Sequence, residues 1–299
     1  MHIYPPINYI EPVFRPPSEA NSLILQVTNG CSWNNCTFCE MYTQPQKKFK
    51  PKSQHDIVED LKRCAQPLAA VRRVFLADGD AMALSFERLK GILLAIKEHL
   101  PTVSRVSSYC LPRNLKKKSV EELAELKALG LELLYVGAES GNDLILSKID
   151  KGETFQSTVD ALHKIKGAGI KSSVMIINGM GGVNYSEQHA LDAAKLVNET
   201  QPEYLATLVL FFRQGEANFI SAFGDDFIMA SQRQLIQEME LFISHLELEK
   251  TIFRSDHASN YLVLKGILNR DKEKLLGMIK MALAQDERTF LRAETSRGL

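Results

Sequence analysis

The feature that most restricts the fold of this chain is a regular alternation of short apolar segments with amphipathic ones. Segments rich in apolar and β-branched residues predict strands at residues 22–27, 74–77, 105–109, 133–137, 172–177 and 204–210. The segments between them have the period of surface helices. About six such units in succession predict parallel strands joined by right-handed helical crossovers, which is an α/β architecture.

Serine residues mark the starts of two of the intervening helices. Ser53 is expected to cap a helix whose apolar face carries Ile57, Leu61 and Cys64. Ser119 begins a capping-box sequence at the start of another helix. Because Cys64 lies on an apolar helix face, we expect it to be a core residue and not a reactive thiol.

A closed barrel of eight units would need two more repeats, which the sequence beyond Gly215 does not provide. That part predicts a loop at 219–227, helices at 232–246 and 271–284, and a brief apolar run at 251–253. We therefore expect a partial, open (β/α)6 barrel of the TIM type with a mainly helical C-terminal extension.

The sequence predicts three domains along the chain. They are an N-terminal extension at 1–21, the partial barrel at 22–215 and a C-terminal cap at 216–299. In a barrel of this kind the active site lies at the carboxyl ends of the strands, where the loops that lead into the helices meet.

Charge and hydropathy argue against several classes of protein. Lys plus Arg and Asp plus Glu each number 36, so no overall field attracts a polyanion. The basic run at 47–52 is the one candidate for a nucleic-acid patch, and we interpret it as a solvated loop, so we expect no nucleic-acid partner. Neither a signal-peptide pattern nor a stretch of about 18 apolar residues occurs, which predicts a cytoplasmic protein without a membrane partner.

Three of the five cysteines lie in one short segment, Cys31-x4-Cys36-x2-Cys39. An odd number of cysteines with three clustered is unlike the paired disulfide framework of a secreted protein. Three thiolates at this spacing can converge on one iron–sulfur cluster and leave one iron open to another ligand. Zinc with a histidine as fourth ligand is the alternative, but the nearest downstream histidine, His55, lies in a predicted helix beyond a lysine-rich loop.

Polar and glycine residues also follow other predicted strands at their carboxyl ends. They are Asp78-Gly79-Asp80, then Ser107, Ser108 and Cys110, then Glu139-Ser140-Gly141, and finally residues 178–182. Because the carboxyl ends of parallel strands meet at one edge of a sheet, we expect these residues to form one continuous site.

Some residues near this edge have two interpretations each. Cys110 is either a second reactive thiol or a small buried side chain, and His189 is either a residue of a helix cap or a catalyst. His257, with Ser259 and Asn260, either contacts the substrate or stands where a helix begins. Cys110 and His257 are the candidates for catalytic residues that the sequence offers.

The cysteine segment has an aromatic residue, Phe38, directly before its third cysteine. Together with the βα units around it, this segment resembles the radical S-adenosylmethionine superfamily over roughly residues 23–210. The commonest motif of that superfamily is C-x3-C-x2-C; the first spacing here is one residue longer, which suggests a less common subgroup. Residues 15–20 and 257–261 are also similar to an uncharacterised bacterial subgroup.

The resemblance implies that Cys31, Cys36 and Cys39 hold a [4Fe-4S] cluster whose fourth iron binds the amino and carboxylate groups of S-adenosylmethionine. It also implies reductive cleavage of S-adenosylmethionine to a 5′-deoxyadenosyl radical, which abstracts hydrogen from an unidentified, small-molecule substrate. An electron donor such as flavodoxin or ferredoxin would serve the cluster. A non-catalytic carrier or chaperone that binds an iron–sulfur cluster or another cofactor on the same fold is the alternative.

The same resemblance assigns residues to S-adenosylmethionine. The residues implied to contact it are Phe38, Asp78, Gly79, Asp80, Ser108, Glu139, Ser140, Ile177 and Gly179. Asp78-Gly79-Asp80 take the place of the superfamily's Gly-Gly-Glu segment, which receives the methionine ammonium, and Glu139 would reach the ribose or that ammonium. Either Arg213 or Lys151 supplies the cation for the carboxylate.

Overall fold

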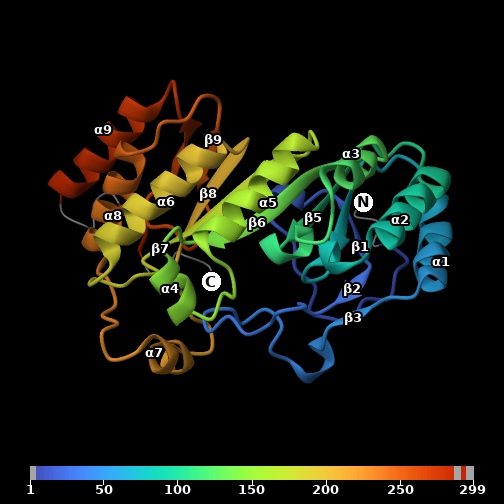
Figure 1. The fold of residues 1–299 in the computed structure, drawn as a ribbon, viewed down its shortest axis with the longest axis horizontal. Coiled ribbons are helices and arrows are strands. Elements are labelled where there is room, and N and C mark those ends of the chain that lie inside the picture. Colours follow the sequence, from blue (N-terminus) through green and yellow to red (C-terminus); the bar gives the residue numbers. More distant parts are fainter. Residues whose placement is uncertain (1–4, 286–290, 294–299) are drawn as a thin grey trace. The chain divides into compact units, whose positions relative to one another are not determined.

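The computed structural model describes residues 5–285 and 291–293. A mostly parallel sheet of eight strands runs in the order β1-β4-β5-β6-β7-β8-β9-β10, with helices in the connections between its strands from β1 to β9 (Figure 1). The chain divides into two compact units. The first unit consists of Met1–Asn34, Met41–Val136 and His163–Ser172, and the second unit consists of Asn35–Glu40, Gly137–Leu162 and Ser173–Leu299.

The strands of the first unit pair in parallel, as the crossover pattern predicts. They are β1 (Leu23–Gln26), β4 (Arg73–Ala77), β5 (Arg105–Cys110) and the greater part of β6 (Leu131–Glu139). A separate antiparallel pair joins β2 (Thr28–Asn29) to β3 (Lys50–Pro51). The buried faces of these strands are nearly continuous apolar runs, which is typical of a parallel sheet covered on both faces.

The helices of the first unit begin where the sequence predicts. They are α1 (Gln54–Ala65), α2 (Phe86–His99) and α3 (Val120–Ala128), with 3-10 turns η1 (Pro17–Glu19), η2 (Pro45–Lys47), η3 (Ala81–Ala83) and η4 (Pro112–Leu115). Ser53 accepts the Asp56 N–H at the start of α1, and Ser119 forms the expected capping box. Ile57 and Leu61 are fully buried, and each such side chain contributes about 1.5–3 kcal/mol.

The second unit contains the rest of the repeats and the C-terminal part of the chain. Its strands are β7 (Lys171–Asn178, mostly in this unit), β8 (Tyr204–Val209), β9 (Ile252–Ser255) and β10 (Leu264–Ile267). Its helices are α4 (Asp143–Lys148), α5 (Phe155–Gly167, mostly in this unit), α6 (Ser186–Thr200), α7 (Ala217–Phe223), α8 (Gln232–Ser244) and α9 (Lys272–Ala284). The fold class is therefore confirmed, whereas the predicted domain ranges stay a prediction.

The C-terminal extension is less purely helical than the sequence suggests. The apolar run at 251–253 is part of β9, which pairs in parallel with β8, and β10 adds an antiparallel strand at the edge. The predicted loop at 219–227 begins within a helix, α7. Phe219, Phe223 and Phe227 repeat at the period of a helix face and pack on one another with ring centroids 4.8–5.5 Å apart, so their burial outweighs the nearby glycine as a loop signal.

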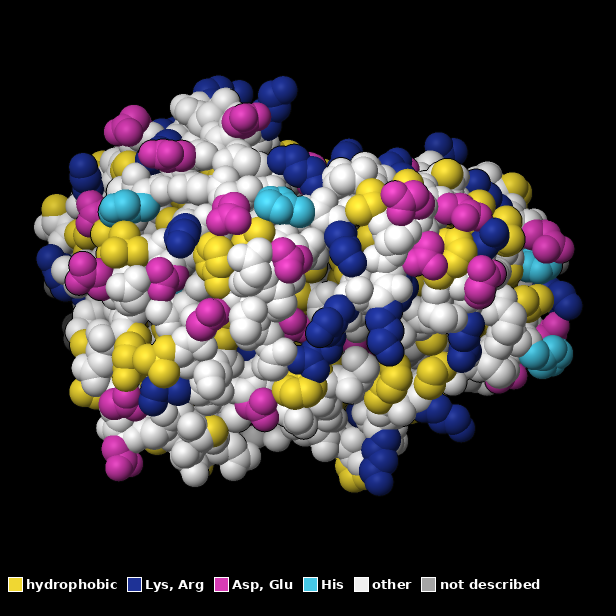
Figure 2. Space-filling model, in the orientation of Figure 1, with side chains coloured by type: hydrophobic (Ala, Val, Ile, Leu, Met, Phe, Trp, Pro, Cys, Tyr) yellow, Lys and Arg dark blue, Asp and Glu magenta, His cyan; other side chains and the backbone are white. Residues whose placement is uncertain are grey.

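The surface agrees with the balanced composition. Acidic and basic side chains both occur across the face shown in Figure 2. No helix within the described residues is long and apolar enough to cross a membrane.

Candidate functional site

In the first unit, Asp80 holds the segment that carries the first cysteine. Its Oδ1 accepts the Ser32 N–H at 2.8 Å, and its Oδ2 accepts the Ser32 hydroxyl and, at 3.0 Å, the Asn114 amide. Burial raises the pKa of Asp80 above its ordinary value, although these hydrogen bonds oppose the shift. Asp80 therefore fixes the backbone next to Cys31 instead of presenting two unengaged oxygens.

Gly79 lets the end of β4 approach the cysteine segment closely. A Cβ atom at this position would lie 1.9 Å from the Gly30 carbonyl oxygen and 2.9 Å from the Cα of Cys31. Its φ is also positive, +61°, which favours glycine. The Gly79 N–H donates to the Tyr42 hydroxyl at 2.8 Å, so the peptide that follows Asp78 is already engaged within the protein.

Asp78 forms a buried ion pair with Lys47, a residue whose role the sequence does not reveal. Both side chains are fully buried; Lys47 Nζ also donates to the Ile10 carbonyl at 2.9 Å. The interpretation of the basic run as a solvated loop is therefore wrong for Lys47, although Lys48 and Lys50 are exposed as expected. A buried acid at a strand end needs a cation, but here the cation comes from a distant loop.

The remaining candidates of the first unit are buried side chains. Ser108 donates to the carbonyls of Leu76 at 3.2 Å and Tyr109 at 2.9 Å. Cys110 is buried, which favours its interpretation as a small core side chain. Burial raises the pKa of Cys64 to about 11, in keeping with an inert core thiol.

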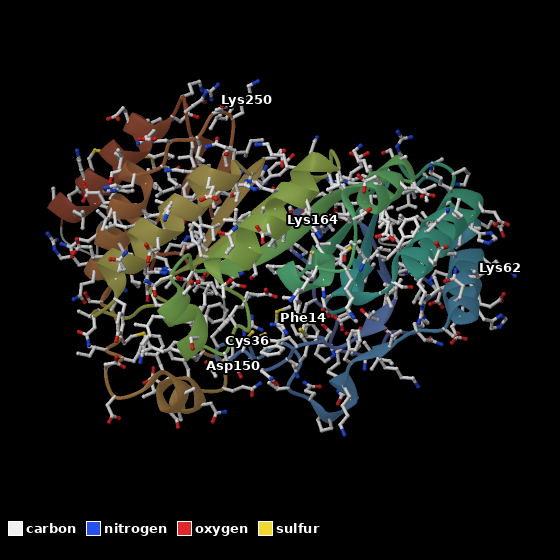
Figure 3. All side chains as sticks on the ribbon, in the orientation of Figure 1. Phe14, Cys36, Lys62, Asp150, Lys164 and Lys250 are labelled. Carbon is white, nitrogen blue, oxygen red and sulfur yellow. The ribbon has the colours of Figure 1, made fainter. Side chains whose placement is uncertain are left out.

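The other two cysteines of the motif lie in the second unit, beside the turn that follows α4. The Thr37 N–H donates to the Ile149 carbonyl at 3.1 Å, and Figure 3 shows Cys36 next to Asp150. Phe38 packs against the aromatic cluster of this unit and its ring centroid lies 5.9 Å from Lys151 Nζ. None of the three motif cysteines is in a disulfide, and all three are partly exposed.

Glu139 and Lys151 form the most unusual polar pair of this unit. Lys151 Nζ donates to Glu139 Oε1 at 2.9 Å, and both side chains are buried. Glu139 Oε2 is also buried but has no hydrogen-bond partner among the described residues. Burial alone would lower the pKa of Lys151, but the Glu139 carboxylate, together with Cys36 and Cys39, raises it above its ordinary value.

The backbone around this pair is adapted to hold it. Glu139 has a positive φ of +65°, a conformation that costs free energy for a residue with a side chain. A Cβ at Gly137 would lie 2.1 Å from Glu139 Oε1 and 3.3 Å from Lys151 Nζ, so only glycine leaves room. A strained residue with an unpaired buried oxygen is typical of a site that receives a ligand.

His189 and Glu238 organise the other predicted strand ends. His189 shares hydrogen bonds with the Ser140 hydroxyl at 2.8 Å and the Ile177 carbonyl at 3.0 Å. Glu238 accepts the Gly179 N–H at 2.6 Å. His189 is thus an internal connector, and Glu238, which no local sequence signal marks, completes this network from α8.

The contacts of Arg213 and His257 do not include Glu139 or Lys151. The Arg213 and Gln214 N–H groups donate to Glu40 at 2.8 and 2.9 Å, while the Arg213 guanidinium lies 5.8 Å from the Phe211 ring centroid. The His257 ring stacks on Phe211 with centroids 6.3 Å apart.

The segment that contains His257 does not begin a helix. Ser259 and Asn260 are buried; Ser259 Oγ accepts the Val209 N–H at 3.1 Å, and Asn260 donates to the Thr207 carbonyl at 2.9 Å. The alternative of a helix start at Ser259 or Asn260 is therefore wrong. These two side chains instead attach the loop after β9 to β8.

Comparison with known proteins gives a consistent family and varied activities. The model of the radical SAM superfamily matches residues 25–194. The chain is 25% identical to a putative methylthiotransferase of Methanocaldococcus jannaschii over 175 residues, which are 56% of this chain and 38% of that protein. It is 22% identical to the heme chaperone HemW of Bacillus subtilis over 166 residues, which are 53% of this chain and 43% of that protein. The chain thus spans about two fifths of the length of these relatives.

Among solved structures, the fold is similar to that of TsrM from Kitasatospora setae, a radical S-adenosylmethionine methyltransferase with cobalamin and a [4Fe-4S] cluster bound. The TM-score is 0.52 at 17% identity, and the match covers 63% of this chain and 36% of that one. At this identity the likeness concerns the fold. The reactions named for these relatives differ, so they do not select one for this protein.

Proposed function

Because the chain belongs to the radical S-adenosylmethionine superfamily, we propose that it is an enzyme that binds a [4Fe-4S] cluster and S-adenosylmethionine and acts on a small-molecule substrate. Cys31, Cys36 and Cys39 would bind three of the irons. Bound at these cysteines, a reduced cluster would supply the one-electron reduction that cleaves S-adenosylmethionine and so starts hydrogen abstraction from the substrate. The remaining residues of the site would bind and orient S-adenosylmethionine and the substrate and shield them from water.

The donor set fits an iron–sulfur cluster. Three partly exposed cysteines occur within nine consecutive residues, and none of them is in a disulfide. Within residues 5–285 and 291–293, no three side chains of His, Cys, Asp or Glu are already grouped as a metal site. We therefore expect the thiolates to be drawn together as the cluster is assembled, since metal binding and local folding are coupled in such sites.

The unpartnered Oε2 of Glu139 is the observation that carries the proposal beyond the family match. It is a buried acceptor to which no described residue donates, and burying such an atom costs free energy unless a ligand donates to it. A ribose hydroxyl or the methionine ammonium of S-adenosylmethionine would supply that donor. Lys151, which lies beside Cys36, Cys39 and Phe38 in the same unit, is then a better partner for the methionine carboxylate than the exposed Arg213.

Asp80 and Gly79 have a supporting role in this proposal. Asp80 fixes the peptide after Cys31, and Gly79 allows that peptide to approach the end of β4. Asp78 neutralises Lys47 within the interior and so is not available as a ligand side chain. We further propose that a flavodoxin or ferredoxin in the cytoplasm donates the electron.

The proposal is tested by anaerobic reconstitution with iron and sulfide, followed by dithionite and S-adenosylmethionine. We expect 5′-deoxyadenosine and methionine to form, and Cys36→Ala to lose both the cubane spectrum and the product. Glu139→Gln should keep the cubane spectrum and weaken S-adenosylmethionine binding by about tenfold, because a charge-assisted hydrogen bond is lost. Cys64→Ala is the matched control, since Cys64 lies in the core.

The competing function is that of a non-catalytic cofactor chaperone; one of the named relatives is a heme chaperone. An intact cluster that yields no 5′-deoxyadenosine under these conditions would favour it. A Cys36→Ala variant with an unchanged cubane spectrum would instead contradict the assignment of the cluster ligands.

A further inference from the structure

A group of cationic and aromatic side chains in the second unit has no part in the site described above. Arg292 donates from Nη1 to the His257 carbonyl at 3.1 Å and from its backbone N–H to the Tyr261 carbonyl at 2.9 Å. His257 stacks on Phe211, and the Arg213 guanidinium lies over the same phenyl ring. The His257 ring and the Arg213 guanidinium therefore both contact the Phe211 ring, and Arg292 is held next to His257 by its hydrogen bond to the His257 carbonyl.

Within residues 5–285 and 291–293, neither Arg213 nor Arg292 forms an ion pair with a carboxylate. Asp256, which directly precedes His257, pairs with Lys265 at 2.7 Å. Glu40 accepts the backbone N–H groups of Arg213 and Gln214 at 2.8 and 2.9 Å. Burial, together with both arginines, lowers the pKa of His257, which leaves its imidazole neutral at pH 7.

The position in the fold suits a ligand. Phe211 and His257 each lie two residues beyond the carboxyl end of a strand, β8 ending at Val209 and β9 at Ser255, and these strands are parallel neighbours. Ligands of α/β sheets bind outside the carboxyl ends of parallel strands. Ser259, buried and bonded to Val209, also shares a hydrogen bond with His257 Nδ1 at 2.9 Å, so the imidazole is fixed and its Nε2 has no partner among the described residues.

We propose that Arg213, His257 and Arg292 form a subsite for an oxyanion of the substrate, a carboxylate or a phosphate, beside the face of Phe211. Planar guanidinium groups bind such anions through paired, charge-assisted hydrogen bonds, and neutral His257 adds a donor at Nε2. This inference rests on the proposed function, because it names the chemical class of the substrate that the radical chemistry would act on.

The test is a calorimetric titration of the full chain with inorganic phosphate and, separately, with benzoate. The parent protein should bind at least one of them, and Arg213→Gln and Arg292→Gln should each weaken that binding by about tenfold. Arg254→Gln is the matched control. Arg254 is exposed on β9, and its substitution removes the same charge. Tighter binding of phosphate or of benzoate would identify the source of the oxyanion.

Two results would overturn the subsite. One is equal affinity in the parent and in the Arg213→Gln/Arg292→Gln double variant; the other is an equal loss in Arg254→Gln, which would indicate a general charge effect. Unfolding midpoints of all variants verify that each remains folded. Formation of 5′-deoxyadenosine without added substrate is measured on the same proteins, so a failure of the radical chemistry is distinguishable from a failure of anion binding.

Discussion

Lys151 Nζ lies 2.9 Å from Glu139 Oε1, and the two side chains are among the few charged groups buried in the second unit. Lys151→Met should lower the free energy of unfolding by about 3–5 kcal/mol, because it leaves the Glu139 carboxylate buried without its cation. Adding Glu139→Gln to that variant should restore much of the loss. Urea denaturation of the single and double variants measures both effects; a double variant that is no more stable than Lys151→Met would contradict the pairing.

The buried pair of Lys47 and Asp78 leads to a separate prediction for the first unit. Lys47→Met should also cost about 3–5 kcal/mol of stability, since Asp78 then lacks its cation and the Ile10 carbonyl loses a donor. Lys48→Met is the control, because the neighbouring Lys48 is exposed. Guanidinium denaturation should leave the control within about 0.5 kcal/mol of the parent. A Lys47→Met variant that is as stable as the parent and the control would mean that Lys47 is solvated like Lys48.

Asp80 should give the protein a distinctive pH dependence. Burial raises its folded-state pKa above the ordinary 3.8, so the folded state binds its proton more tightly than the unfolded chain does. The contribution of Asp80 to stability is therefore full below about pH 4 and is lost as pH rises through the folded pKa. Asp80→Asn removes this pH-dependent contribution to stability and keeps a side-chain oxygen that can accept the Ser32 N–H.

The measurement for Asp80 is the free energy of unfolding of the parent and of Asp80→Asn at a series of pH values from about 4 to 7. The parent should lose stability relative to the variant as pH rises. Parallel curves for the two proteins would show that the pKa of Asp80 is not raised.

The cysteines should differ in their reaction with iodoacetamide in the cluster-free protein. Cys31, Cys36 and Cys39 are partly exposed, whereas Cys64 is buried and its pKa is about 11. Because the thiolate is the nucleophile, Cys64 should react at least about tenfold more slowly at pH 8. Peptide mass spectrometry after timed quenching gives the rates, with urea-unfolded protein as the control for intrinsic reactivity. Equal rates in the folded protein would refute the assignment of Cys64 to the core.

Features that depend on neighbouring residues were predictable from the sequence. The start of α1 at Ser53 and the capping box at Ser119 follow from side chains that bond to the backbone a few positions away. The six parallel strands follow from apolar runs separated by amphipathic segments. The cysteine segment was also evident, because its three thiols lie within one short stretch.

Features that depend on distant pairing were not predictable. β9 and β10 are short, and their identity as strands comes from pairing with β8 and with each other, not from local pattern. Lys47 looks like part of a basic surface run until Asp78 provides its buried partner. Glu238 lies on α8, and its bond to the Gly179 N–H joins segments that no spacing rule connects.

Glu40 directly follows the third cysteine, and its carboxylate accepts the N–H groups of Arg213 and Gln214 at 2.8 and 2.9 Å, across 173 and 174 positions of sequence. A single acidic side chain thus connects the segment of the cysteines that we propose as cluster ligands to Arg213, which we propose for substrate recognition. Loss of the cluster should weaken the hydrogen bonds between Glu40 and the Arg213 and Gln214 N–H groups, and should therefore lower the affinity for the anion. Metal loading and substrate affinity would then be thermodynamically linked, each strengthening the other.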